Sequence, residues 1–188
     1  MMNRMNSRDV SRRALIQSAA FVPLAALTLP AQQSALTPPQ MKTLVAFIDR
    51  LIPRDDLGPG AVDAGAQIYI DRVLAGPNAS EKQSFVQGLE AVDVSARRTH
   101  GAAFAELSAD QRDQILTEML GSPFFNRARR LTLEGMFSDP YYGGNKNFAG
   151  WDLIRYPGPR PAVAADDQKL NVEIRPYRVS AYGVKYGH

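Results

Sequence analysis

The chain has 188 residues, 45% of them hydrophobic, with no cysteine, two histidines and a formal net charge of +3 at pH 7. This length and composition suit one domain with a buried core, and the lack of cysteine excludes disulfides, thiolate nucleophiles, iron–sulfur clusters and covalently attached haem c. The charge lies in residues 1–31, which carry four arginines and one aspartate, so the neutral remainder has no basic excess for binding nucleic acid.

Residues 1–31 have the layout of an export signal. Arg12 and Arg13 precede a short apolar run at 18–29, and a Pro-Ala-Gln sequence follows that run. The paired arginines resemble a twin-arginine signal, so we expect export to the periplasm by the twin-arginine translocase, with cleavage after Ala31 or near Ala35. The apolar run is shorter than the roughly 20 residues that span a bilayer, and a retained membrane anchor is the alternative.

A linker at 32–39 leads into a body at 40–137 that is predicted to be helical. Apolar residues recur there at helical spacing, with Ser, Thr, Gly and Pro at the ends of each run. No alternation of strands and helices is visible, which argues against a parallel sheet. The predicted fold is all-α, a compact bundle of about five helices. The first helix is predicted from an N-cap at Thr37 to Ile52, and the second over 61–75. The third starts with a capping box at Ser80 and Gln83 and ends at Gly101. The fourth starts with a capping box at Ser108 and Gln111 and ends at Gly121, and the fifth runs from Ser122 to Phe137.

The last segment, 138–188, is predicted to be a long and mostly irregular C-terminal arm. It holds the only tryptophan and six of the seven tyrosines, whereas disordered tails are poor in aromatic residues. We therefore expect the arm to be ordered by packing, either on its own helices or on another chain, with a short strand near 182–186. The candidate partner interface comprises Tyr141, Tyr142, Gly143, Gly144, Asn145, Trp151, Tyr156, Tyr182 and Tyr186.

No catalytic, cofactor-binding or metal-binding residue is predicted in this chain. His100 lacks a neighbouring triad partner and has the position of a helix C-terminus, where a cationic side chain is favoured. Asp55, Asp56, Asp63 and Asp71 lack the alternating spacing of a calcium loop. Two other classes remain open: an autonomous enzyme that uses His100 with the loop carrying Asp55 and Asp56, and a helical module that binds a solute.

Several motifs resemble those of the gluconate 2-dehydrogenase subunit 3 family. They occur in the family's order over about residues 40–160. The stretches that carry the resemblance are 51–65, 69–77, Phe124 with Phe125, 132–145, Gly150 with Trp151, and 156–159.

The resemblance implies a non-catalytic small subunit of a periplasmic dehydrogenase that oxidises a sugar, a sugar acid or a polyol. FAD and the catalytic residues would belong to a large flavoprotein subunit of the glucose–methanol–choline type. A cytochrome c subunit with haem c often accompanies such a pair and places it at the membrane. The small subunit would stabilise the flavoprotein and carry it through twin-arginine export.

Overall fold

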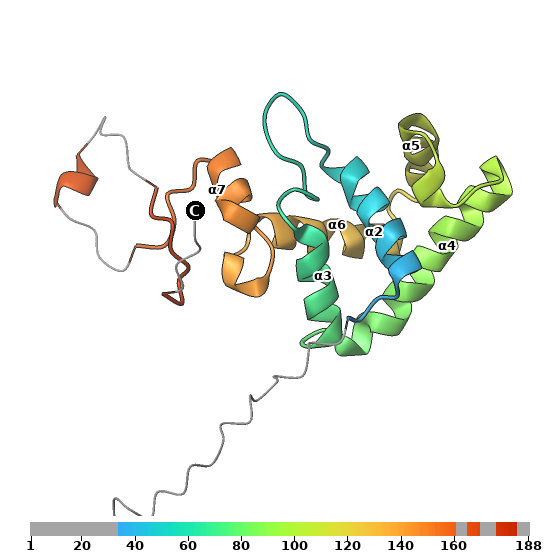
Figure 1. Cartoon of the computed structure of the whole chain (residues 1–188), viewed down its shortest axis with the longest axis horizontal. Helices are drawn as coiled ribbons and strands as arrows, with labels where there is room; N and C mark the ends of the chain where they lie inside the picture. The colour runs from blue at the N-terminus through green and yellow to red at the C-terminus, as the bar shows by residue number, and fades with distance from the viewer. Residues whose placement is uncertain (1–33, 161–164, 170–175, 184–188) are drawn as a thin grey trace, which may run out of the picture. The chain divides into compact units, whose positions relative to one another are not determined.

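The computed structural model describes residues 34–160, 165–169 and 176–183, and within them the chain is helical (Figure 1). Arg12, Arg13 and Tyr186 lie outside these residues. The described part contains no strand, so the prediction of an all-α bundle is confirmed. The helices are α2 (Pro38–Leu51), α3 (Ala66–Ala75), α4 (Lys82–His100), α5 (Ala109–Glu118), α6 (Pro123–Phe137) and α7 (Ala149–Leu153), and the single-turn 3-10 helices are η1 (Ala79–Glu81), η2 (Phe104–Glu106), η3 (Pro140–Tyr142), η4 (Lys146–Phe148) and η5 (Ala165–Gln168).

Three predicted helix starts agree with the structure. The Ser108 hydroxyl accepts a hydrogen bond from Gln111 N, and the Gln111 side chain accepts one from Ser108 N, which completes the predicted capping box before α5. Ser122 Oγ accepts from Phe125 N at the start of α6. The first helix follows Thr37, whose N–H donates to the Gln40 side chain.

Two predicted helix starts are wrong. The second helix begins at Ala66 rather than at residue 61, because Gly65 has φ +76° and turns the chain just before it. The capping box expected at Ser80 does not open the third helix. Ser80 lies inside η1 instead, and α4 follows directly at Lys82.

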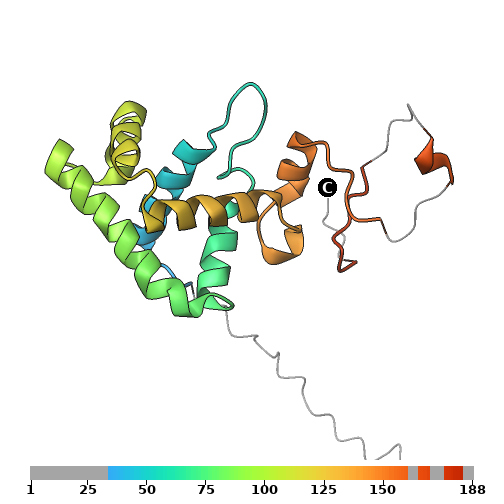
Figure 2. The same cartoon turned by 180° about the vertical axis from the view of Figure 1, so that it is seen from behind.

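The core forms around α2. Phe47 is fully buried on this helix, and its ring centroid lies 5.5–6.4 Å from those of Phe104, Phe124 and Phe125. Edge-to-face and tilted aromatic pairs of this kind add to the hydrophobic stabilisation of a core. Helices α3, α4 and α6 surround α2, as the two opposite views show (Figures 1 and 2).

Helices α3 and α6 approach each other closely at Gly135. A Cβ atom at this position would lie 2.9 Å from Ala66 Cα, so only glycine permits the observed distance. This contact fixes the C-terminal half of α6, from which the aromatic segment continues. None of the described helices is both long and apolar enough to span a bilayer.

Candidate functional site

The turn that follows α6, residues 138–158, is organised by the side chain of Asn145. This residue is fully buried and has φ +46°. Its Oδ1 accepts hydrogen bonds from the backbone N–H groups of Gly150, at 2.9 Å, and Trp151, at 3.4 Å. Its Nδ2 donates to Ser138 O at 2.9 Å, and its own N–H donates to Gly135 O at 2.8 Å. Asn145 therefore holds the beginning of the turn to α7 and to the end of α6.

Two glycines bring this turn into direct contact with the backbone of α6. A Cβ atom on Gly144 would lie 1.9 Å from Gly135 O, and one on Gly150 would lie 1.9 Å from Met136 O. Neither position can take a side chain unless the backbone moves. Phe148, between them, has φ +62°, a conformation that is rare for a bulky residue. The turn is thus held in an uncommon conformation by its surroundings.

Trp151 is an interior residue of this turn. Its side chain is buried, and its Nε1–H donates to Phe137 O at 2.9 Å. The rings of Phe148 and Tyr156 pack against the indole, with centroids at 5.4 and 5.0 Å. Packing on the chain's own helices, which was one of the two expectations for this segment, therefore accounts for Trp151.

The exposed part of the turn presents three tyrosines, which we call the tyrosine cluster: Tyr141, Tyr142 and Tyr182. They are 50%, 42% and 56% exposed. The Tyr141 and Tyr182 ring centroids lie 4.4 Å apart, Tyr142 packs edge-on against both rings, and the Tyr142 and Tyr182 hydroxyl groups share a hydrogen bond. That hydrogen bond raises the pKa of Tyr142. Three aromatic rings that are together and exposed are typical of a binding surface.

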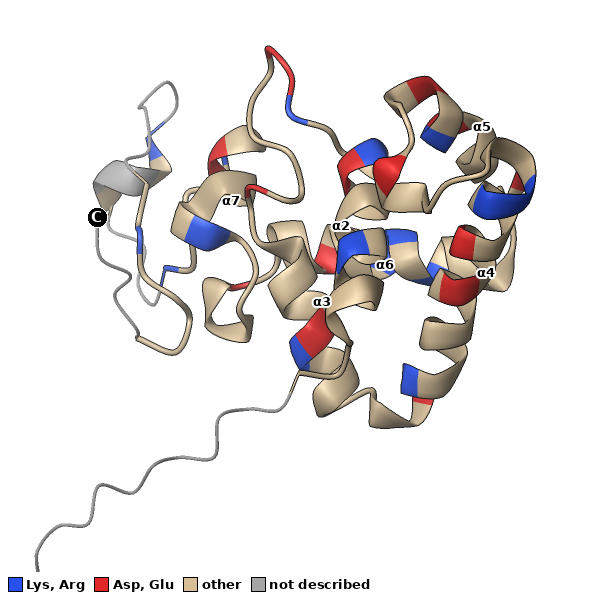
Figure 3. Ribbon diagram, turned by 45° about the vertical axis from the view of Figure 1, so that its right-hand side comes forward, with Lys and Arg blue, Asp and Glu red and all other residues tan. Residues whose placement is uncertain are grey.

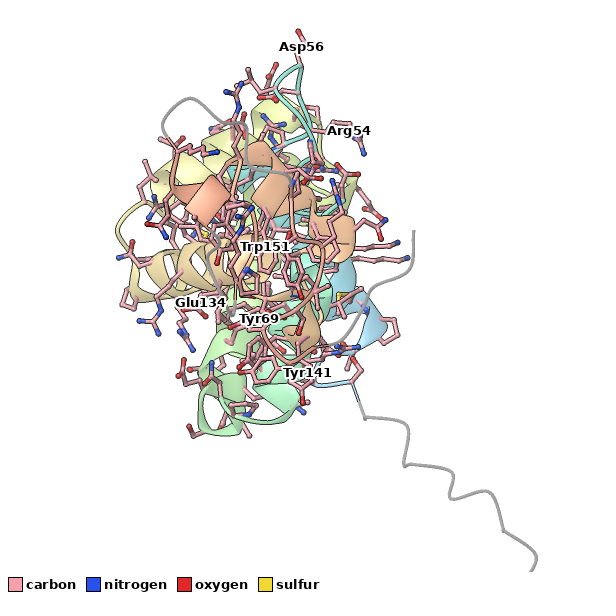
Figure 4. The ribbon with its side chains drawn as sticks, turned by 90° about the vertical axis from the view of Figure 1, so that its left-hand side faces the viewer. Arg54, Asp56, Tyr69, Glu134, Tyr141 and Trp151 are labelled. Carbon is pink, nitrogen blue, oxygen red and sulfur yellow. The ribbon has the colours of Figure 1, made fainter. Side chains whose placement is uncertain are left out.

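Tyr69 on α3 and Glu134 on α6 form a hydrogen-bonded pair near the tyrosine cluster. The Tyr69 hydroxyl donates to Glu134 Oε2 at 3.1 Å, and Figure 4 shows the two side chains next to each other. Burial of the phenol, followed by the charge and hydrogen bond of Glu134, raises the pKa of Tyr69 to about 12. Tyr69 therefore stays protonated at neutral pH and acts as a hydrogen-bond donor rather than as a base.

A cavity of about 430 Å³ lies between α4 and the start of α6. Phe85, Gly88 and Phe124 contribute to its mainly apolar wall, and an ion pair between Arg127 and Glu81 lies at its edge. Because both charges of this pair are matched, the cavity has no free charge for a charged ligand.

The structure does not bring together the residues that were considered as catalytic or metal-binding candidates. Asp63 pairs with Arg54, Asp71 accepts from Ser34 Oγ and Leu36 N, and Asp55 caps its own turn. Asp56 lies at the tip of the loop after α2 (Figure 4). Across the described ranges, no three His, Cys, Asp or Glu side chains are placed to hold a metal ion. His100 ends α4, and its Nε2 is buried without a hydrogen-bond partner among the described residues.

The predicted interface residues divide into two groups. Tyr141, Tyr142, Tyr156 and Tyr182 are exposed, whereas Gly144, Asn145 and Trp151 are buried and Gly143 is half-buried. The buried members shape the turn, and the exposed members are the ones that a second chain can reach. Of the predicted strand near 182–186, residues 182–183 are described, and they lie in a turn that Gly183 N closes on Ser180 O.

Sequence reasoning missed two residues of this site. Asp139 is the N-cap of η3, and its carboxylate binds the backbone of both Tyr141 and Ala181. The Ser-Asp-Pro sequence is a recognisable cap signal for the first of these contacts. Arg178 binds Asp152 from far along the chain, and no local pattern indicates that contact.

A family model described as gluconate 2-dehydrogenase subunit 3 matches residues 38–158. No curated protein and no solved structure gives a significant match. The matched range begins with the first residue of α2 and ends at residue 158, the last residue of the turn that Asn145 organises.

Proposed function

The chain belongs to the gluconate 2-dehydrogenase subunit 3 family, and we propose that it is the non-catalytic small subunit of a periplasmic, FAD-dependent dehydrogenase acting on a sugar, a sugar acid or a polyol. Its direct partner is a large flavoprotein subunit of the glucose–methanol–choline type, which holds FAD and the catalytic residues. A cytochrome c subunit with haem c then takes the electrons. In this proposal FAD belongs to the partner, as the family resemblance implies.

The contribution of this subunit is thermodynamic. A chain that binds the folded flavoprotein and not the unfolded one stabilises the folded state by mass action. The leader of this chain would then direct the assembled pair to the twin-arginine translocase, which transports folded proteins. Arg12 and Arg13 serve as the export signal in this proposal.

The observation that carries the proposal is the tyrosine cluster, of which Tyr141 and Tyr142 lie on a rigid turn within the family region. Tyr141 and Tyr142 are about half exposed, and the turn beneath them is fixed by Asn145 and by two glycine contacts. Tyrosine is enriched at protein interfaces because its ring gives a large apolar contact and its hydroxyl group can still form a hydrogen bond. A fixed turn also has little conformational entropy to lose on binding.

Purification of the tagged chain from its native host tests the proposal. We expect a yellow large subunit in equal ratio, identified by its flavin absorbance. Replacing Tyr141 and Tyr142 by Ala should raise the Kd of the complex at least about thirtyfold, as expected for interface hot spots worth about 2 kcal/mol. Leu120→Ala is the control, because Leu120 is 62% exposed and lies outside the turn. A chain that purifies alone, or a tyrosine variant with the wild-type Kd, would contradict the proposal.

The export role has a separate test. Replacing Arg12 and Arg13 by Lys keeps the charge and removes the twin-arginine signal. Both subunits should then accumulate in the cytoplasm, as measured by cell fractionation with a Sec-exported protein as control. Continued export of the flavoprotein with this variant would refute the carrier role and leave the stabilising role intact.

A further inference from the structure

Residues 176–183, which we call the strap, lie beyond the family region and yet bind back onto its last turn. The family region ends at residue 158. Tyr177 N donates to Pro157 O at one end of the strap. Gly158 accommodates this contact, since a Cβ atom there would lie 2.2 Å from Tyr177 O. The strap is therefore closely packed against the turn rather than placed beside it by chance.

Arg178 anchors the middle of the strap. Its guanidinium donates to Asp152 Oδ2 at 2.7 Å and to Asn147 O at 3.2 Å. It also lies over the ring of Phe148, with Cζ 5.6 Å from the centroid. These three contacts reach α7 and the two positive-φ residues directly before it, Asn147 and Phe148. One arginine thus joins the strap to the most constrained part of the turn.

Asp139 links the far end of the strap to the tyrosine cluster. Its Oδ1 accepts from Tyr141 N at 2.9 Å, and its Oδ2 accepts from Ala181 N at 2.7 Å. A single carboxylate therefore positions the backbone on both sides of the stacked pair formed by Tyr141 and Tyr182. Without the strap, Tyr141 and Tyr142 would lose the ring that packs against both of them.

We propose that the strap is a preformed part of the surface that docks the large subunit. It folds back on its own chain before the partner arrives and presents Tyr182 with Tyr141 and Tyr142 as one aromatic surface. This inference rests on the proposed function. A preformed strap differs from an arm that wraps the partner. The strap loses its conformational entropy when the chain folds and not when the complex forms.

The charges beside the cluster indicate the chemistry of the partner's surface. Arg72 and Lys146 are exposed, lie next to Gly143 and Gly65 respectively, and form no salt bridge with any described residue. Figure 3 shows acidic as well as basic residues on α3 and around α7, so it is Arg72 and Lys146, the two cations without an ion-pair partner among the described residues, that indicate the charge of the partner's surface. The complementary surface on the large subunit is therefore apolar, with carboxylates at its edge.

Limited proteolysis of the full chain, purified without its partner, tests whether the strap is preformed. Trypsin cleaves after Arg178, and the docked strap protects this bond. Asp152→Asn and Asp139→Asn each remove one anchor without changing the cleavage site, so cleavage at this bond should be about fivefold faster in each variant. Asp56→Asn is the control, because Asp56 is exposed at the tip of the loop after α2. Equal rates in all four proteins would overturn the proposal.

A charge exchange in the complex tests whether the strap serves docking. Arg178→Asp and Asp152→Arg should each raise the Kd for the large subunit about fivefold, and the double variant should recover most of the loss because it restores an ion pair. Single variants with the wild-type Kd, or a double variant without recovery, would overturn the docking role. Recovery is not expected if Arg178 contacts the partner directly. A wild-type chain that binds no large subunit refutes the proposed function itself, and the protease rates then still report whether the strap is formed.

Discussion

Single residues in the turn after α6 show how a polar side chain replaces regular secondary structure. Asn145 binds three backbone groups with its side chain, and the neighbouring glycines allow two backbone segments to touch. A buried amide with all of these bonds formed is stabilising, whereas removal of the side chain leaves buried backbone groups unpaired. At this scale the turn depends on residues that the sequence pattern places in an irregular segment without indicating their contacts.

Gly144→Ala is expected to destabilise the chain by about 3 kcal/mol, the upper range for overpacking, because its Cβ would lie 1.9 Å from Gly135 O. Urea unfolding of the purified chain measures the loss. Gly121→Ala is the matched control. Gly121 has φ +79° and no atom near its Cβ position, so the same substitution should lose only about 1 kcal/mol through backbone strain. Similar losses in both variants would show that the close contact is not limiting.

Tyr69 gives a second prediction for a single residue. Its pKa is raised to about 12 by burial and by Glu134, so Glu134→Gln should lower that pKa toward the ordinary value of about 10. Tyrosinate absorbance, recorded against the matching Tyr69→Phe protein, isolates this one group. In the unfolded chain the phenol ionises first, so stability should fall as the pH rises from about 10 to 12, and Tyr69→Phe should lack that part of the loss. An unchanged pKa in Glu134→Gln would refute the contribution assigned to Glu134 and leave burial as the cause.

Helices α2 and α5 are joined by a bidentate ion pair. Arg50 Nε and Nη2 donate to the two carboxylate oxygens of Asp113, both at 2.8 Å. The hydrogen bond from Arg50 is the main reason why the pKa of Asp113 is lowered. The pair therefore stabilises the folded chain above the unfolded pKa of Asp, and this contribution is lost as the pH falls through the lower pKa of the folded state.

Asp113→Asn should lower stability at pH 7 by no more than about 1 kcal/mol, since Asp113 is half exposed and solvent screens the pair. The difference from the wild type should shrink below about pH 4 and should also shrink in high salt. Urea unfolding at a series of pH values measures it. Glu90→Gln, at an exposed site on α4 without a salt bridge to the described residues, should show no such pH dependence. A difference that persists at pH 2 would have to come from packing.

Helix prediction succeeded where local chemistry determines the start of a helix. The N-caps at Ser108 and Ser122 satisfy backbone N–H groups within the same turn, so the signal is contained in the sequence. The predicted start at residue 61 was wrong because residues 61–65 have helical spacing but form a separate turn. Gly65, in a left-handed conformation, ends that turn before α3 begins at Ala66. Prediction failed at Ser80 because the same pattern of residues fits a 3-10 turn as well as a capping box.

The candidate site was only partly predictable for a related reason. The aromatic residues were visible from composition, but their exposure depends on contacts over long sequence separations. Trp151 is buried because the turn packs against α6. Tyr182 contacts Tyr142 across a sequence separation of 40 residues. Neither fact has a local signal. The family resemblance, by contrast, depended on short motifs and was confirmed over residues 38–158.

For the whole molecule, the turn after α6 belongs to the same packed unit as the helices. The indole of Trp151 donates to Phe137 O in α6, and Asn145 N donates to Gly135 O. A segment held in this way should not open separately from the bundle.

Because Trp151 is the only tryptophan in the sequence, its fluorescence reports on the turn and can be compared with a signal from the helices. In urea, Trp151 fluorescence and far-UV circular dichroism of the helices should show the same midpoint, as in two-state unfolding. Asn145→Ala is the informative comparison, since loosening the turn should move the fluorescence midpoint to lower urea than the helical one. A wild-type chain with two separate midpoints would show that the turn is an independent unit.

The start of the described chain has a consequence for the export signal that we propose at residues 1–31. Ala35 and Leu36 are buried, and Asp71 on α3 holds this stretch through Ser34 Oγ and Leu36 N. A peptidase needs its substrate extended and reachable. If the chain crosses the membrane already folded, a cut near Ala35 would require this anchored stretch to detach from α3. We therefore expect the mature polypeptide to begin at Gln32, a mass that intact-protein spectrometry can distinguish from a later cut.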